Sequence, residues 1–187
     1  MTTSHYVIRG GMAGRERLRV IARVMSPTTE DLFDRVGVEP TARCLDVGCG
    51  GGDVTVALAR RAHDGAAVGV DVDETKIDLA RAEAADAGVE NVEFRLQDVM
   101  DPAPGRELFD VVYGRFLLTH LPDPAAALAN MRERLVPGGV LVVNPSLDSS
   151  TFIESIPHRL ARPNSGLVVV CTNKYSGPPN LLLTNRK

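Results

Sequence analysis

The chain has 187 residues, of which 44% are apolar and 24% are charged, and its formal net charge at pH 7 is −3. This length and composition fit one globular domain with a sizeable core, and they exclude an intrinsically disordered chain. A slightly acidic chain also lacks the basic face with which proteins grip nucleic-acid phosphates, so we expect no nucleic-acid partner.

The cysteines and the apolar runs exclude further classes of protein. Cys44, Cys49 and Cys171 stand at unrelated spacings, which fit neither a disulfide framework nor a zinc motif. No apolar run approaches the roughly 18 residues of a transmembrane helix, and residues 1–14 lack the apolar segment of a signal peptide. We therefore expect a cytoplasmic protein without a metal site or a membrane partner.

The first 40 residues are predicted to be helical. Four apolar side chains within residues 15–25 recur at the spacing of one helix face and predict an amphipathic helix there. A second, short helix is predicted over residues 28–36, with a threonine as its N-cap. Together these helices would form an N-terminal cap.

Strand and helix signals then alternate up to residue 143. Asp73 is a helix N-cap and Gly88 follows the end of that helix, while Asp123-Pro124 starts another. Strands that alternate with helices of this length imply a parallel sheet with helices on both faces. The predicted strands cover residues 43–47, 67–70, 92–96, 109–113 and 140–143, and the predicted helices cover residues 53–61, 74–87 and 124–135.

The composition changes near residue 150. Residues 1–150 carry a net charge of −7, whereas residues 151–187 carry +4. Two apolar segments in this tail, residues 166–172 and 181–183, predict two terminal antiparallel strands. The second segment would leave an apolar edge that can pair with another chain, so we expect a monomer or a homodimer.

A glycine-rich turn follows the first predicted strand, at the end where ligands of open α/β sheets bind. Gly48 and Gly50 allow the backbone to turn sharply and let a ligand lie directly against it. The second predicted strand ends in Asp71, and a carboxylate in that place can accept hydrogen bonds from both hydroxyls of a ribose. The two features together indicate a nucleoside cofactor.

Acidic residues around the turn indicate which nucleoside it is. Asp53 occupies the third glycine position of a dinucleotide fingerprint, where a carboxylate would repel a pyrophosphate. Asp53 and Asp46 favour a cofactor with a cationic end, such as S-adenosylmethionine, over NAD. An NAD-dependent oxidoreductase, the less favoured alternative, would also need a catalytic Tyr/Lys or His dyad, and Lys76 is the only lysine before residue 174.

Five motifs follow one another over about 100 residues. They are Leu-Asp-Val-Gly-Cys-Gly-Gly-Gly-Asp at 45–53, Gly-Val-Asp at 69–71, Phe-Arg-Leu-Gln-Asp at 94–98, the segment 109–123 and Leu-Val-Pro-Gly-Gly-Val-Leu-Val-Val at 135–143. In this order they resemble the class I S-adenosylmethionine-dependent methyltransferases of the small-molecule type. The resemblance implies a Rossmann-like, doubly wound α/β fold whose mostly parallel, seven-stranded sheet can be shortened at its C-terminal strands.

The resemblance also implies roles for individual residues at the methionine end of the cofactor. Asp46 and the backbone of Gly48, Cys49 and Gly50 are implied to surround the methionine moiety. Arg115 lies where the backbone of the family contacts the same end. We interpret the Cys49 side chain itself as a small space-filling group.

At the adenosine end, the resemblance assigns four positions. Asp71 is implied to hold the ribose hydroxyls and Val72 to flank the adenine. Asp98 is implied to accept a hydrogen bond from the adenine amino group, and Val99 to supply a backbone N–H.

The sequence says less about the part of the site that would bind the methyl acceptor. Tyr6 and Arg9 are implied to close the pocket, and we interpret His120 as structural, since no motif fixes a catalytic base. Asn144-Pro145 stands where relatives carry an acidic strand end, so the tail departs from the family there.

These observations predict a single methyltransferase domain. It would comprise an N-terminal helical cap over residues 1–40, a cofactor-binding core over residues 41–145 and an atypical C-terminal tail over residues 146–187. The expected function is methyl transfer from S-adenosylmethionine to a small-molecule acceptor. The alternative is a non-catalytic S-adenosylmethionine-binding protein or partner subunit with a truncated acceptor site.

Overall fold

The computed structural model describes residues 12–101 and 107–144, which form a parallel sheet with helices on both of its faces. The strand order is β3-β2-β1-β4-β5, and every neighbouring pair is parallel. The strands are β1 (Arg43–Val47), β2 (Ala66–Asp71), β3 (Val92–Leu96), β4 (Phe109–Arg115) and β5 (Leu135–Asn144). The helices are α1 (Met12–Val36), α2 (Asp53–Arg61), α3 (Glu74–Asp86), the 3₁₀ turn η1 (Leu118–His120) and α4 (Pro124–Glu133).

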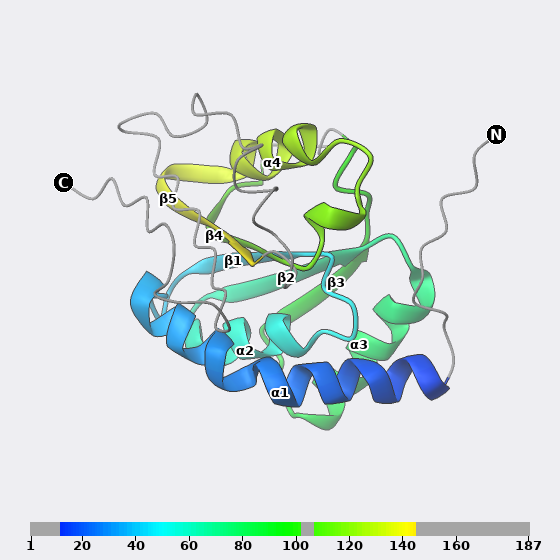
Figure 1. The fold of residues 1–187 in the computed structure, drawn as a ribbon. Helices are drawn as coiled ribbons and strands as arrows, with labels where there is room; N and C mark the ends of the chain where they lie inside the picture. The colour runs from blue at the N-terminus through cyan, green and yellow to red at the C-terminus, as the bar shows by residue number, and fades with distance from the viewer. Residues whose placement is uncertain (1–11, 102–106, 145–187) are drawn as a thin grey trace.

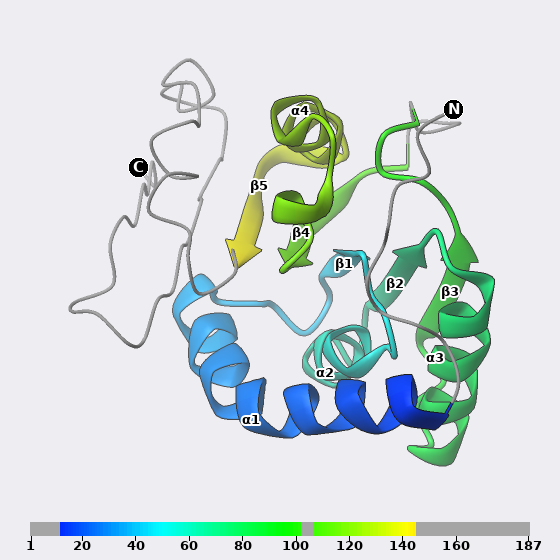
Figure 2. The ribbon, with the colours of Figure 1, turned by 45° about the vertical axis from the view of Figure 1, so that its right-hand side comes forward.

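The helices cover the two faces of the sheet unequally. Figure 1 shows α1, α2 and α3 on one face and α4 on the other, and Figure 2 shows the same layers from a second direction. Alternate residues of the central strands supply the two cores: Cys44 and Tyr113 pack on the α2 side, and Leu45 and Val112 on the α4 side. The predicted doubly wound α/β fold is confirmed.

The direction in which the strands are added to the sheet reverses between β1 and β4. β2 and β3 follow on one side of β1, whereas β4 and β5 lie on its other side. Such a switch point leaves a crevice at the carboxyl ends of the two central strands, where ligands bind. Five of the seven expected strands lie in the described part of the chain, and the predicted tail strands at 166–172 and 181–183 lie outside it.

The N-terminal region forms one helix, so the prediction of two helices was wrong. α1 runs from Met12 to Val36 straight through Pro27. A proline inside a helix removes an N–H donor and costs about 3 kcal/mol. Beyond it, Leu32 and Phe33 are fully buried in the α2-side core, and burial of two such side chains contributes about 3–6 kcal/mol. The burial explains why the helix continues.

The boundary between α4 and β5 also differs from the prediction. α4 ends at Glu133, and Leu135, which we expected to be helical, is the first residue of β5. Leu135 pairs with Phe109, and a register shift then takes up the extra residues before Val111 pairs with Val140. The Pro-Gly-Gly segment is therefore an irregularity within the strand rather than a turn before it.

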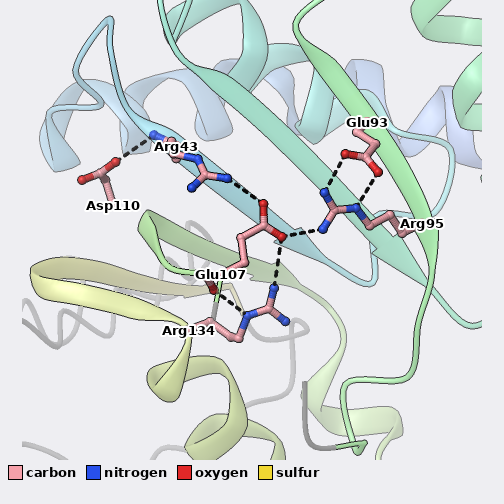
Figure 3. Close-up of polar contacts among 6 residues, drawn as sticks. All are labelled: Arg43, Glu93, Arg95, Glu107, Asp110 and Arg134. Atoms are coloured by element: carbon pink, nitrogen blue, oxygen red, sulfur yellow. Dashed lines mark hydrogen bonds and ion pairs between the residues drawn. The ribbon is translucent and has the colours of Figure 1, made fainter. Parts of the chain in front are cut away.

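A cluster of ion pairs joins residues of different strands (Figure 3). The Glu107 carboxylate, just before β4, lies 2.6 Å from Arg43 Nη2, 2.5 Å from Arg95 Nη1 and 4.0 Å from Arg134 Nη2. Arg95 also makes a two-point contact with Glu93 at 2.6 Å. One carboxylate thus ties together residues of β1 and β3 and the C-cap residue of α4. The Asp110 Oδ2 accepts a hydrogen bond from the Arg43 backbone N–H at 2.8 Å. We call the whole set the Glu107 cluster: Arg43, Glu93, Arg95, Glu107, Asp110 and Arg134.

Glu107→Gln is expected to lower the free energy of unfolding at pH 7 by about 1–3 kcal/mol. The substitution removes the negative charge of the carboxylate, with which three guanidinium groups interact. The hydrogen bond from Arg95 holds the pKa of Glu107 below its usual value of 4.5, although partial burial opposes this. A lowered folded-state pKa gives stabilisation that is complete above the unfolded pKa and is lost as the pH falls through the folded one.

Urea denaturation at pH 7 and at about pH 3 tests this expectation. The variant and the wild type should differ at pH 7, and the difference should be smaller at the lower pH. Glu90→Gln, at an exposed glutamate outside the cluster, is the control and should change little at either pH. A Glu107→Gln deficit of equal size at both pH values would contradict the electrostatic explanation.

Candidate cofactor site

The glycine turn between β1 and α2 forms the floor of the candidate site. Gly48, Gly50 and Gly52 have φ angles of +72°, +54° and +82°, in the left-handed region that favours glycine. The Gly48 and Cys49 N–H groups both donate to the Val70 carbonyl, at 2.8 and 3.0 Å. The turn is therefore fixed to the end of β2, next to the switch point.

The Cys49 side chain is buried within this turn. Burial raises the pKa of its thiol, and the nearby Asp46 and Asp71 raise it further. The thiol is therefore neutral, which agrees with the interpretation of Cys49 as a space-filling residue.

Asp71 links the turn to the start of α3. Its Oδ2 accepts a hydrogen bond from the Gly50 N–H at 3.0 Å, and its Oδ1 accepts one from the Asp73 N–H at 3.0 Å. Lys76, itself buried, places Nζ 3.9 Å from Asp71 Oδ1 and 4.0 Å from Asp73 Oδ2. The Asp71 side chain is 4% exposed, and the two N–H groups take two of the roughly four acceptor positions of its carboxylate.

Asp46 faces α2 rather than open space. Asp46 is only 2% exposed, and its Oδ2 accepts a 2.6 Å hydrogen bond from the Thr55 hydroxyl. Burial raises the pKa of Asp46 to about 7, against the lowering effect of the Thr55 hydrogen bond; Asp53 raises it further. The site therefore contains a carboxyl group that changes charge near neutral pH.

Asp53 does not act as an isolated acid. Its Oδ2 lies 2.7 Å from Arg115 Nη2, so the first residue of α2 forms an ion pair with the last residue of β4. Burial disfavours the charge on Arg115, but Asp53, Tyr113 and Asp46 outweigh it and raise the arginine pKa. The prediction that Asp53 favours a cationic ligand group is weakened, because the pair has no net charge.

The remaining predicted residues follow the ends of β2 and β3. Val72 directly follows Asp71 and is 57% exposed, which leaves an apolar surface open to a ligand. Asp98 Oδ1 accepts a 2.8 Å hydrogen bond from the Met100 N–H and so stabilises its own loop. The Val99 carbonyl accepts a hydrogen bond from Asn130 Nδ2 of α4 at 2.9 Å. The structure thus places all nine predicted site residues in the turn or at the carboxyl ends of β1, β2, β3 and β4.

Several side chains that lie against the site residues were not among those predicted. Thr55 binds Asp46, Lys76 lies beside Asp71, and Asn130 binds the loop after β3. Leu117 covers the turn, because a Cβ added at Gly48 would lie 3.0 Å from its Cδ1. A threonine in the first turn of α2 carries only a weak sequence signal, and the other three contacts depend on the fold.

Other predicted positions lie at the margin of the site or outside the described chain. His120 is exposed on η1, and Tyr6 and Arg9 fall in the part that is not described. Within residues 12–101 and 107–144, no cluster of three His, Cys, Asp or Glu side chains could hold a metal ion. None of the helices in those ranges has the length and apolar character to span a bilayer.

Comparison with known proteins shows that the chain is similar to methyltransferases in both sequence and structure. The model of the family described as "Methyltransferase domain" matches residues 39–172. The ubiquinone biosynthesis O-methyltransferase of Hahella chejuensis is 37% identical over 119 residues, which are 63% of this chain and 48% of that protein. The chain thus spans about half or less of the length of the curated relatives it matches.

Solved structures show the same fold. PKMT2 from Rickettsia typhi in complex with AdoHcy matches with a TM-score of 0.52 and 26% identity, over 56% of this chain and 21% of that one. A SAM-dependent methyltransferase from Aquifex aeolicus matches with a TM-score of 0.56 over 81% of this chain and 69% of that one. Its identity of 18% makes it a likeness of fold alone.

Proposed function

Since the chain belongs to the class I S-adenosylmethionine-dependent methyltransferases, we propose that it binds S-adenosylmethionine at the switch point and transfers its methyl group to a small-molecule acceptor. The observation that carries the proposal is the Asp71 carboxylate, which joins the glycine turn to the end of β2. It lies where a ribose would meet both elements.

The residues present fit the cofactor of the family. Asp71 can accept hydroxyl donors in addition to the two N–H groups it already binds. The exposed Val72 side chain offers an apolar surface for an adenine ring, and Asp98 and Val99 follow β3 on the same edge. At the other end, the turn depends on the left-handed φ angles of Gly48 and Gly50, and Leu117 lies against Gly48.

In this proposal the chain contributes alignment more than chemical catalysis. The cofactor supplies a methyl group that its sulfonium already activates toward an in-line displacement. The residues around the turn fix the position of that end, and fixed positions can contribute several kcal/mol to a two-reactant step. A base is needed only if the acceptor keeps its proton near pH 7, and we assign that role to no residue.

The acceptor is proposed to be a hydroxyl group of a small molecule. Support comes from relatives named as O-methyltransferases, at 37% and 39% identity over 119 and 100 residues. We also propose a cytoplasmic protein, either monomeric or homodimeric, with no nucleic-acid partner. Light scattering on the purified chain tests the oligomeric state.

Calorimetric titration with S-adenosylmethionine and S-adenosylhomocysteine tests the cofactor assignment. Asp71→Ala should weaken both affinities more than tenfold, about 1.4 kcal/mol, since the ribose loses its acceptor. Asp73→Ala, which removes the neighbouring carboxylate and the cap of α3, should leave the affinities within about twofold. Absence of binding by the folded wild type would overturn the assignment.

Turnover distinguishes the enzyme from a non-catalytic binding protein with the same fold. S-adenosylhomocysteine formation is measured with a panel of phenols and aliphatic alcohols as acceptors. Formation that depends on the acceptor supports the transferase. Tight cofactor binding with no product from any hydroxyl, amine or thiol in an extended panel would instead support the non-catalytic alternative.

A further inference from the structure

The Arg115 side chain has a buried hydrogen-bond donor that pairs with none of the described residues. This side chain is only 11% exposed, and Nη2 binds Asp53. Nη1 is also buried, yet it has no hydrogen-bond partner among the described residues. Buried guanidinium donors are nearly always paired, because an unpaired donor has lost its hydrogen bonds to water without replacing them. An unpaired donor at a ligand site indicates a missing ligand atom.

The position of Arg115 places this donor beside the glycine turn. Gly114 pairs with Val47 in the sheet, so Arg115 and Gly48 are the residues immediately beyond that pair. Arg115 also reaches the first residue of α2 through Asp53. The guanidinium therefore lies between the end of β4 and the turn that the cofactor is proposed to contact.

The chemistry of the donor selects an anion. A guanidinium presents two parallel N–H directions that match the two oxygens of a carboxylate. Asp53 occupies one side of the Arg115 fork, which leaves the other for a ligand. The N-cap of α2 is Gly52, which makes no side-chain cap bond, so negative charge at this end is also favoured by the helix.

We propose that Arg115 Nη1 binds the α-carboxylate at the amino-acid end of S-adenosylmethionine and that Asp53 positions the guanidinium for this contact. The inference rests on the proposed function, which requires the cofactor to be present. It assigns a role to the Arg115 side chain and names the ligand group that this side chain binds. The family resemblance implies only a backbone contact at this position.

Decarboxylated S-adenosylmethionine isolates the contact, because it keeps the adenosine, the sulfonium and the ammonium and lacks only the carboxylate. The wild type should bind S-adenosylmethionine at least tenfold more tightly than the decarboxylated compound. Arg115→Met should remove this preference. Its affinity for S-adenosylmethionine should fall at least tenfold, whereas its affinity for the decarboxylated compound should change less than twofold.

Two further variants complete the test. Arg115→Lys keeps a charge that can pair with Asp53 and should retain part of the preference. Arg61→Met removes an arginine that is 24% exposed and pairs with Glu30 and Asp34 near the other end of α2. It should leave both affinities unchanged. Thermal melts of every variant confirm that the binding data come from folded protein.

The outcomes separate the inference from the proposed function. If the folded wild type binds neither compound, the cofactor assignment fails and the inference with it. If the wild type binds S-adenosylmethionine and Arg115→Met weakens both compounds equally, Arg115 is structural and only the inference is overturned. An Arg115→Met variant that binds both compounds as the wild type does would also overturn it, and would leave Nη1 free for an anionic acceptor.

Discussion

Gly52→Ala is expected to lower the free energy of unfolding by about 2–5 kcal/mol. Two costs add at this position. Gly52 has φ +82°, a conformation that costs a residue with a Cβ about 1–2 kcal/mol. The added Cβ would also lie 2.9 Å from Ala80 Cβ and from Phe94 Cζ, and such overpacking costs about 1–3 kcal/mol.

Gly88→Ala is the matched control for this substitution. Gly88 has φ +65°, but a Cβ there would meet nothing within 4 Å. Its expected cost is therefore the backbone term alone, about 1–2 kcal/mol. Urea denaturation followed by circular dichroism gives both values, and equal losses for the two variants would show that contact with α3 and β3 at Gly52 is harmless.

Asp46→Asn is expected to stabilise the cofactor-free protein at pH 8 by about 2–4 kcal/mol, because one pKa unit corresponds to about 1.4 kcal/mol. Burial raises the pKa of Asp46 from 3.8 to about 7, so the folded state holds a proton that the unfolded state releases. Stability then falls as the pH rises between these two values and stays reduced above them. Asparagine can still accept the Thr55 hydrogen bond and carries no charge.

Denaturation of wild type and variant at pH 4, 6 and 8 measures this effect. The two proteins should be nearly equal in stability at the lowest pH and diverge toward pH 8. Thr55→Val is the companion variant, since it removes the donor that favours the charged form. It should destabilise the protein by about 1–3 kcal/mol. A constant difference between Asp46→Asn and wild type at all three pH values would refute the raised pKa.

Much of the fold could be predicted from local pattern. The strands at 43–47 and 92–96 have the expected bounds, and the helices that begin at Asp53, Glu74 and Pro124 start where their signals predict. These segments are short, strongly patterned and bounded by glycine or by a capping aspartate. The Asp73 cap is seen in the structure, where its side chain accepts from the Thr75 N–H at 3.0 Å.

The errors arose where tertiary contacts outweigh local preference. Two helices were predicted, over residues 15–25 and 28–36, but the burial of Leu32 and Phe33 favours one continuous helix through Pro27. Leu135 continues the helical pattern of α4, yet it pairs with Phe109 in the sheet. Neither of these tertiary contacts can be deduced from the short stretch of sequence around the residue.

The candidate site was predictable in location and less so in detail. The sequence places acids and glycines at strand ends, and parallel strands bring those ends together. Which partner each side chain takes depends on the folded distances. The Asp46–Thr55 and Asp53–Arg115 contacts join residues 9 and 62 positions apart, and the second has no local signal.

The Asn130 contact couples the adenosine end of the site to α4. Its Nδ2 binds the carbonyls of Val99 and Met100, and both of those side chains pack against the α4-side core. A ligand that orders this loop would then also restrain α4, which covers the face of the sheet opposite to α2 and α3 (Figure 1). Amide hydrogen exchange in α4 should therefore slow on cofactor binding, although no predicted ligand contact lies on that helix.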